Sequence, residues 1–263
     1  MPSLYVIGDI HGQKAQLDRA LGLIEADGGP DARIIFVGDY TDRGPDSRGV
    51  LDTLIEGHRA GRNWTLIRGN HDRMFTRFVI RGEVFDPKIK SMKTWLHFRL
   101  GGNTTLASYF DLEQFCADNG HTVDALDAIG HDLTLDPLHK ALQAAAQDAV
   151  PRAHMDFLTG LPLTHTEDGF FFVHAGINPK LPLRLQDEED LIWIRDGWLD
   201  HRGPLPMMVV HGHTARDFPE HAGNRINADG GAAYGNDLVP VVLDGDRVFT
   251  LGDQGRTPLT PAG

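Results

Sequence analysis

Short apolar runs alternate with helical patterns through the N-terminal part of the chain, and this alternation limits the fold more than any other feature. Three runs are too short for helices and indicate buried strands: 4–7, 34–37 and 64–67. Between them, apolar residues recur at helical spacing over Leu17–Ile24 and again over Val50–Ile55, where Ser47 is the predicted N-cap. The order β-α-β-α-β with short connections predicts an α/β fold, in which helices pack on a parallel sheet.

A long helical stretch interrupts the strand pattern. Helical patterns cover three segments: 125–129, 138–150 and 154–158. We therefore predict that residues 1–263 form one domain with a helical insertion at about 82–158, anchored to the core by residues such as Trp95. Strand patterns return at four segments: 170–173, 207–210, 238–243 and 247–251. Asp244-Gly245-Asp246 predicts a hairpin between the last two, and Pro240 predicts that this hairpin lies at a sheet edge.

The composition of the chain disfavours several classes of function. The formal net charge is −12, which argues against non-specific binding to nucleic acid or anionic lipid. The single cysteine, Cys116, rules out an intrachain disulfide and fits a reducing compartment. No basic leader precedes the first apolar run, and no apolar stretch approaches the ~18 residues of a membrane span. We therefore expect a cytoplasmic protein without a membrane or nucleic-acid partner.

Five short motifs place metal-binding or proton-transferring side chains directly after apolar runs. They are GDIHG at 8–12, GDYTDRG at 38–44, GNHD at 69–72, VHAG at 173–176 and VHGHT at 210–214. Ligands bind at the carboxyl ends of strands in open α/β sheets, where the strand ends are rigid and the loops are free to vary. A single Gly-Asp pair after a strand usually marks only a turn. Five such motifs in one chain instead indicate a site built at one sheet edge.

Carboxylates, imidazoles and an amide in these motifs match the ligands of a two-metal site. Asp9 and His11, two residues apart at a strand end, point the same way and can share one ion with Asp39. The two oxygens of Asp39 allow it to bridge this ion and a second one, whose ligands would be Asp39, Asn70, His174 and His213. Two divalent ions ~3.5–4 Å apart hold a hydroxide between them and bind phosphoryl oxygens. Nitrogen and oxygen ligands without thiolate favour Mn²⁺, with iron or zinc as alternatives, over magnesium.

Residues beside the proposed ligands supply an acid and a phosphate clamp. His71 can protonate the leaving oxygen, and Asp42 can bind the imidazole ring and fix its tautomer. Arg43 and Arg195 are candidates to bind phosphate oxygens through the forked guanidinium group, and Asn70 adds a further contact to the phosphate. The alternative roles are a turn cap for Asp42 and a surface salt bridge for Arg195.

In this order, over residues 8–214, the motifs resemble the phosphoprotein phosphatase family of calcineurin-like metallophosphoesterases. The resemblance implies a β-sandwich flanked by helices, with a dinuclear metal centre at the sheet edge. It also implies attack by metal-bound water without a phosphoenzyme intermediate. Motif by motif, it assigns the same metal ligands, the Asp42–His71 acid pair and the two arginine clamps.

The match is closest to the bacterial and phage-type serine/threonine protein phosphatases. Residues around Arg195 are similar to their Trp-x-Arg segment, and residues 227–235 are similar to the segment after their last histidine. The chain differs from the eukaryotic members by Asp72 in GNHD and by Ala175 in VHAG. Neither difference removes a ligand or the acid.

The motifs leave three classes of function to compare. The first is a metal-dependent phosphatase that acts on phosphoserine and phosphothreonine in proteins, with phosphotyrosine or a small phosphorylated molecule as further candidates. The second is a symmetrical diadenosine tetraphosphate hydrolase or another nucleotide phosphohydrolase, a group that also carries GNHD but tends to lack an aspartate at the position of Asp42. The third is a phosphate-binding module without activity, which the intact ligand and acid set disfavours. We therefore expect the protein phosphatase.

Overall fold

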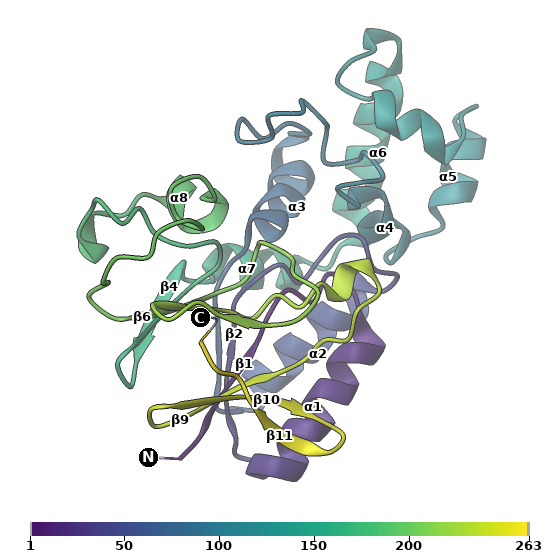
Figure 1. The fold of residues 1–263 in the computed structure, drawn as a ribbon. Helices are drawn as coiled ribbons and strands as arrows, with labels where there is room; N and C mark the ends of the chain where they lie inside the picture. Colours follow the sequence, from purple (N-terminus) through teal and green to yellow (C-terminus); the bar gives the residue numbers. More distant parts are fainter. Residues whose placement is uncertain (1, 262–263) are drawn as a thin grey trace.

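The computed structural model describes residues 2–261 and contains two β-sheets packed against each other (Figure 1). The six-stranded sheet has the order β11-β10-β9-β1-β2-β3. Its strands are β1 (Leu4–Ile7), β2 (Arg33–Phe36), β3 (Trp64–Leu66), β9 (Val241–Asp244), β10 (Arg247–Gly252) and β11 (Gly255–Pro258). The five-stranded sheet has the order β4-β5-β6-β8-β7. Its strands are β4 (Thr164–Glu167), β5 (Phe170–Val173), β6 (Met208–His211), β7 (Glu220–His221) and β8 (Arg225–Asn227).

Parallel pairing in both sheets brings strand ends to a common edge. In the six-stranded sheet β1 pairs parallel to β2, and β2 to β3. In the five-stranded sheet β5 pairs parallel to β6, and β6 to β8. The carboxyl ends of parallel neighbours lie side by side, so the segments that follow these strands meet at one edge of each sheet.

Alternating side chains of β1 show how the layers are built, because successive residues of a strand face opposite sides of the sheet. Leu4 and Val6 are buried between the sheets, in one cluster with Phe172 and Val210 of the five-stranded sheet. Tyr5 belongs to the larger cluster on the other side, where the helices pack. The sequence therefore folds into a β-sandwich with helices on the outer face of the six-stranded sheet.

Two helices connect the parallel strands of that sheet and pack on it: α1 (Lys14–Gly28) and α2 (Ser47–Arg59) (Figure 1). The predicted cap of α2 is wrong by one residue. Asp46 Oδ1 accepts the hydrogen bond from the Gly49 N–H (2.7 Å). Ser47 instead accepts a hydrogen bond from the Asp42 N–H at its hydroxyl oxygen (3.1 Å), which ties the start of α2 to the GDYTDRG loop.

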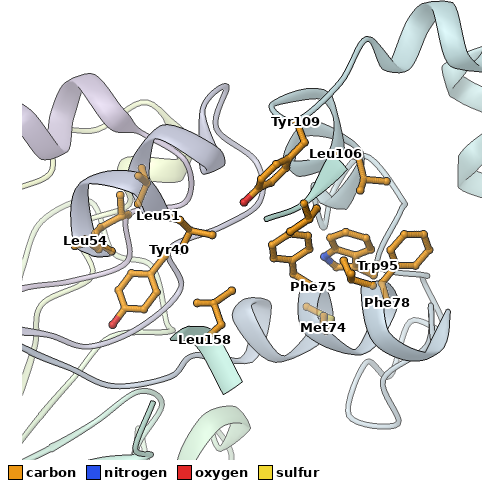
Figure 2. Close-up of a cluster of buried hydrophobic side chains, with 14 of the residues drawn as sticks. Tyr40, Leu51, Leu54, Met74, Phe75, Phe78, Trp95, Leu106, Tyr109 and Leu158 are labelled. Carbon is orange, nitrogen blue, oxygen red and sulfur yellow. The ribbon is translucent and has the colours of Figure 1, made fainter. Parts of the chain in front are cut away.

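The remaining helices are α3 (Asn70–Arg81), α4 (Gly102–Ala107), α5 (Leu112–Asp118), α6 (Asp136–Ala149), α7 (Arg152–Gly160) and α8 (Glu188–Trp193). Short 3₁₀ helices lie at η1 (Val123–Ala128), η2 (Leu133–Leu135), η3 (Leu183–Leu185) and η4 (Ala232–Tyr234). Figure 2 shows Trp95 beside two rings of α3, with centroid distances of 5.8 Å to Phe75 and 4.9 Å to Phe78. These contacts fix the helical segment 82–158 to α3. Its status as an insertion within a single domain over residues 1–263 stays a prediction.

The C-terminal hairpin is confirmed, but its predicted position is wrong. β9 and β10 pair antiparallel around the turn at 244–246. β9 lies between β10 and β1, and β11 forms the edge of the sheet. Pro240 precedes the first residue of β9, where the missing N–H removes no ladder hydrogen bond.

Candidate metal centre and active site

The five motifs meet at one edge of the sandwich. Asp9 follows β1, Asp39 follows β2, and Asn70 begins α3 just after β3. From the five-stranded sheet, His174 follows β5 and His213 follows β6. Each of these five side chains belongs to a residue that is at most 7% exposed. The structure therefore brings predicted ligands from both sheets into one buried cluster.

Asp9, His11 and Asp39 form the first group of predicted ligands. His11 Nε2 lies 3.9 Å from Asp9 Oδ2 and 3.5 Å from Asp39 Oδ2. The other ring nitrogen, His11 Nδ1, donates to the Thr41 carbonyl oxygen (2.8 Å), so Nε2 carries the lone pair, which accepts from Arg43 and could bind a cation. The nearest three-residue group around this histidine contains His71 in place of Asp9, with the ligand atoms of His11, Asp39 and His71 within 4.8 Å of one another.

Asp39, Asn70, His174 and His213 form the second group. His174 Nε2 lies 3.4 Å from Asp39 Oδ2 and 2.8 Å from Asn70 Oδ1, and His213 Nδ1 lies 2.9 Å from the same amide oxygen. His174 Nδ1 donates to the Val37 carbonyl oxygen (2.8 Å). When the ring is neutral, its Nε2 lone pair converges with a carboxylate oxygen and an amide oxygen as acceptors, whereas a protonated ring donates its Nε2–H to them. A cation satisfies such a set, and these nitrogen and oxygen donors suit manganese, iron or zinc.

The buried charges at this edge strongly affect one another. Burial lowers the pKa of His174, but attraction and hydrogen bonding to Asp39, attraction to Asp9 and the hydrogen bond to Val37 together outweigh it and raise that pKa to about 9. Burial raises the pKa of Asp39, but His174, His71 and His11 together outweigh it and hold that pKa well below its usual value. Burial and the neighbouring Asp229 carboxylate raise the pKa of Asp9 well above its usual value. Buried carboxylates that raise the pKa of neighbouring groups in this way form a favourable environment for cations.

The backbone of the site adopts conformations that most residues avoid. Among residues 2–261, seven non-glycine residues have a positive φ, and five of them are predicted site residues. They are His11 (47°), Asp39 (55°), Asp42 (75°), Arg43 (67°) and His213 (67°). Such conformations persist only where surrounding contacts enforce them, and they concentrate at functional sites. Gly212 permits a close approach there, because a Cβ at this position would collide with the Asp9 carboxylate.

His71 and Asp42 form the buried pair that the sequence predicts. His71 Nδ1 lies 2.7 Å from Asp42 Oδ2, and both residues are buried. The carboxylate accepts two further hydrogen bonds, from Trp95 Nε1 (2.8 Å) and Thr105 Oγ1 (2.7 Å), both in the segment 82–158. Three donors thus fix the orientation of Asp42, which rules out a role as a turn cap alone. With Nδ1 held by Asp42, the other nitrogen of the His71 ring, Nε2, lies 2.9 Å from Arg43 Nη2.

The two predicted clamps lie at the same place. Arg43 Nη1 lies 2.5 Å from His11 Nε2, and Nη2 lies 2.9 Å from His71 Nε2. Arg195 Nη2 donates to the His213 carbonyl oxygen (3.3 Å), and within residues 2–261 Arg195 forms no ion pair. Both arginines line a cleft of about 660 Å³, together with Asp39, Asn70, His71 and His213. The cleft therefore gives access from outside to the predicted site.

Several residues of the site were not identified as functional from the sequence. Asp72 accepts hydrogen bonds from the backbone N–H groups of Asp39 (2.9 Å), Tyr40 (2.9 Å) and Gly69 (3.0 Å), and so joins two ligand loops. Burial, reinforced by Asp39, raises the pKa of Asp72 to about 7. The position of Asp72 inside GNHD was the available signal. For Asp229, the signal was its place in the glycine-rich segment 227–235.

Comparison with known proteins agrees with this geometry. The chain belongs to the calcineurin-like phosphoesterase family, whose model matches residues 2–243. The members of this family are metal-dependent hydrolases of phosphoric esters, so this chain is an enzyme of that class. The family predicted from the motifs and the predicted α/β fold, a β-sandwich flanked by helices, are therefore confirmed.

Individual relatives differ in their named activities. A bis(5'-nucleosyl)-tetraphosphatase PrpE [asymmetrical] of Geobacillus thermodenitrificans is 25% identical over 89% of this chain and 87% of its own length. Serine/threonine-protein phosphatase 1 of Salmonella typhimurium is 42% identical, but over only 27% of this chain and 30% of its own length. A cold-active protein-tyrosine phosphatase of a psychrophilic Shewanella species has a similar fold, with a TM-score of 0.60 and 14% identity over 99% of this chain and 81% of that one.

None of the helices within residues 2–261 combines the length and the apolar character needed to cross a bilayer.

Proposed function

We propose that this enzyme is a two-metal phosphomonoesterase that removes phosphate from phosphoserine and phosphothreonine side chains. One observation carries the proposal. A buried His71–Asp42 pair lies beside two converging groups of nitrogen and oxygen ligands, at a cleft that also holds Arg43 and Arg195. This combination provides the groups needed to bind phosphate, activate water and protonate a leaving oxygen.

Six side chains would hold the metal ions. Asp9, His11 and Asp39 would bind one ion, and the second would have the ligands Asp39, Asn70, His174 and His213. When bound, two such ions lower the pKa of water and polarise phosphoryl oxygens. The donor set favours Mn²⁺, with iron or zinc as alternatives.

His71 would act as the general acid. Its Nδ1–H donates to Asp42, so Nε2 is the atom that can hold and deliver a proton. Asp42 stabilises the protonated ring and is itself held by Trp95 and Thr105. A proton delivered from Nε2 to the ester oxygen would turn the leaving group into a neutral alcohol.

Arg43 and Arg195 would bind the phosphate oxygens. Arg43 already spans His11 and His71, so its guanidinium lies between the predicted ligands and the predicted acid. Arg195 enters from a different loop and has no carboxylate partner among the residues that the structure describes. Two guanidinium groups from separate loops can bind different oxygens of one phosphate and orient the ester bond toward His71. Asn70, which also lines the cleft, would add a contact to the phosphate.

The choice of substrate rests on Asp42. A protein phosphatase of this type requires an acid pair for an alkoxide leaving group, and the pair is intact and buried here. A second candidate is hydrolysis of dinucleoside tetraphosphates, which the Geobacillus relative favours because it aligns over 89% of this chain. The expected partner is a phosphoprotein or a small phosphorylated molecule for the first candidate, and a small phosphorylated molecule for the second. The free, buried Cys116 supports a reducing compartment such as the cytoplasm of a bacterial cell.

Purified enzyme with added Mn²⁺ tests the proposal. We expect hydrolysis of p-nitrophenyl phosphate and of phosphoserine peptides, with a higher kcat/KM for the peptides than for diadenosine tetraphosphate. Strong preference for the dinucleotide would replace the protein phosphatase with the second candidate. Failure to hydrolyse any of the three substrates with Mn²⁺, iron or zinc would reject both.

A further inference from the structure

The cleft that reaches the predicted metal ligands continues well beyond them. Its lining includes the buried His71 and His213 and also the exposed Lys88 and Lys180. At about 660 Å³, its volume lies in the range of pockets that enclose drug-sized ligands. A single phosphate group contacts only the inner part of such a space, so the outer part is available for the rest of the substrate.

Lysines gather in this outer part. The chain has only six lysines and a formal net charge of −12, yet three of the six line this cleft: Lys88, Lys90 and Lys180. Lys90 forms an exposed ion pair with Asp196 (3.0 Å). Within residues 2–261, neither Lys88 nor Lys180 forms an ion pair or a side-chain hydrogen bond. Two ammonium groups in the cleft therefore have no protein partner.

The acidic groups near these lysines already have partners. Glu189 binds Arg73 through both carboxylate oxygens (2.7 and 3.1 Å), and this contact lowers the pKa of Glu189. Asp190 accepts a hydrogen bond from the neutral Asn178 side chain (3.3 Å) and keeps its charge. Two ammonium groups, Lys88 and Lys180, therefore face one carboxylate without an ionic partner, and the remaining positive charge favours an anion.

The two loops that carry the lysines are fixed relative to each other. Arg73, on α3, is only 3% exposed. It donates to Asp86 (2.9 Å), two residues before Lys88, and to Glu189 of α8, which follows the loop that contains Lys180. Figure 1 shows α8 and the loop after α3 on the same side of the molecule. A buried guanidinium thus joins both walls of the cleft to one helix, which limits their relative movement.

We propose that Lys88 and Lys180 form a second phosphate-binding subsite. This inference rests on the proposed function, because the first phosphate is the one held at the metal ligands by Arg43 and Arg195. The subsite would take a further phosphate of the same substrate, either in an oligophosphate chain or on a neighbouring phosphorylated residue. Lysine ammonium groups bind phosphate as point charges and tolerate varied geometry, which suits a subsite away from the reacting bond.

Inhibition of p-nitrophenyl phosphate hydrolysis by tripolyphosphate and by orthophosphate tests the subsite, at a fixed concentration of free Mn²⁺. Wild-type enzyme should bind tripolyphosphate more tightly than orthophosphate. In the Lys88→Gln, Lys180→Gln double variant, the ratio of the two inhibition constants should fall roughly two- to thirtyfold, the loss expected for two exposed ion pairs. Lys140→Gln, on α6 outside the cleft, is the matched control and should keep the wild-type ratio. Any metal chelation by tripolyphosphate affects all variants equally.

Two further ligand pairs distinguish the source of the second phosphate. One compares a peptide carrying two phosphoserines with its singly phosphorylated form, and the other compares adenosine tetraphosphate with adenosine monophosphate. If the double variant no longer prefers the ligand with more phosphates in one of these pairs, the subsite is supported, and that pair identifies the kind of ligand it binds. An unchanged ratio for tripolyphosphate and for both pairs overturns the subsite. Calorimetric titration measures the binding of tripolyphosphate to the same variants without any hydrolysis. It therefore tests the subsite even if the proposed phosphomonoesterase activity is absent.

Discussion

Replacement of Thr105 by valine isolates the contact between the helical segment and the predicted acid pair. Thr105 is fully buried, and its hydroxyl donates to Asp42 Oδ1 (2.7 Å) and accepts from the Asp42 N–H (2.8 Å). Valine has nearly the same volume but no hydroxyl. The Asp42 N–H keeps a partner in Ser47 Oγ (3.1 Å), which itself loses a contact to the Thr105 hydroxyl (3.0 Å). The strongest of the lost contacts is the hydrogen bond to the buried carboxylate.

A hydrogen bond to a charged group contributes about 1.5–3 kcal/mol, so the free energy of unfolding should fall by that amount. If the same energy holds Asp42 and His71 in place during turnover, kcat should fall by roughly ten- to hundredfold. The Thr105→Ser control keeps the hydroxyl and should stay within about 1 kcal/mol and a few-fold of wild type.

Denaturant unfolding followed by tryptophan fluorescence gives the stability change, because Trp95 is buried in the large hydrophobic cluster (Figure 2) and binds the same Asp42 carboxylate. Steady-state hydrolysis of p-nitrophenyl phosphate at saturating Mn²⁺ gives kcat, and metal content is measured in parallel. Equal kcat values for the valine and serine variants would refute the claim that Thr105 positions the acid pair. Loss of bound metal in the valine variant would also refute it, because Thr105 contacts no predicted ligand.

The other predictions concern the acid, the clamp and a buried histidine. His71→Asn should lower kcat by ~10²–10⁴-fold with nearly unchanged metal content; loss of the metals on elemental analysis would assign His71 to the ligands instead. Arg195→Ala should weaken inhibition by orthophosphate about tenfold, the loss of one hydrogen bond to a charged group, and an unchanged inhibition constant would count against the clamp. His154 binds Tyr109 (2.8 Å) and Asp52 (3.0 Å), and burial lowers its pKa below 6.5 although Asp52 opposes the shift. Its contribution to stability is therefore present above about pH 6.5 and is lost as pH falls through that value, because the unfolded chain binds the proton first. Between pH 7.5 and pH 5.5, the free energy of unfolding measured with denaturant should fall more for wild type than for His154→Asn. An equal fall in both proteins would contradict a buried neutral ring.

The sequence predicts the strands that have a continuous apolar pattern. The strands at 4–7 and 170–173 are confirmed to the residue. The strand β4 reads Thr-His-Thr-Glu, and β7 has only two residues, so neither carries an apolar signal. Both lie at edges of their sheet, where half-exposed polar residues are tolerated. The helices α4 and α5 were also missed, because six or seven residues are too few to establish a period.

In the candidate site, too, the sequence predicts the residues that lie in local motifs and misses the contacts that depend on tertiary structure. The predicted ligands lie in short motifs at strand ends, and a parallel sheet brings such ends together. Trp95 was expected only to anchor the helical segment, and nothing local to it indicates the hydrogen bond to Asp42, 53 residues away. The role of Asp229 beside Asp9 likewise depends on the sandwich as a whole. Contacts between distant segments are therefore the part that one sequence cannot supply.

Anomalous diffraction from crystals grown with Mn²⁺ tests the central claim most directly. The account predicts two peaks ~3.5–4 Å apart, on either side of the Asp39 carboxylate. Asp39→Asn should lower the occupancy of both ions, because this residue is the proposed bridge. A fully active enzyme with one ion per chain, or with ions bound away from these side chains, would contradict it.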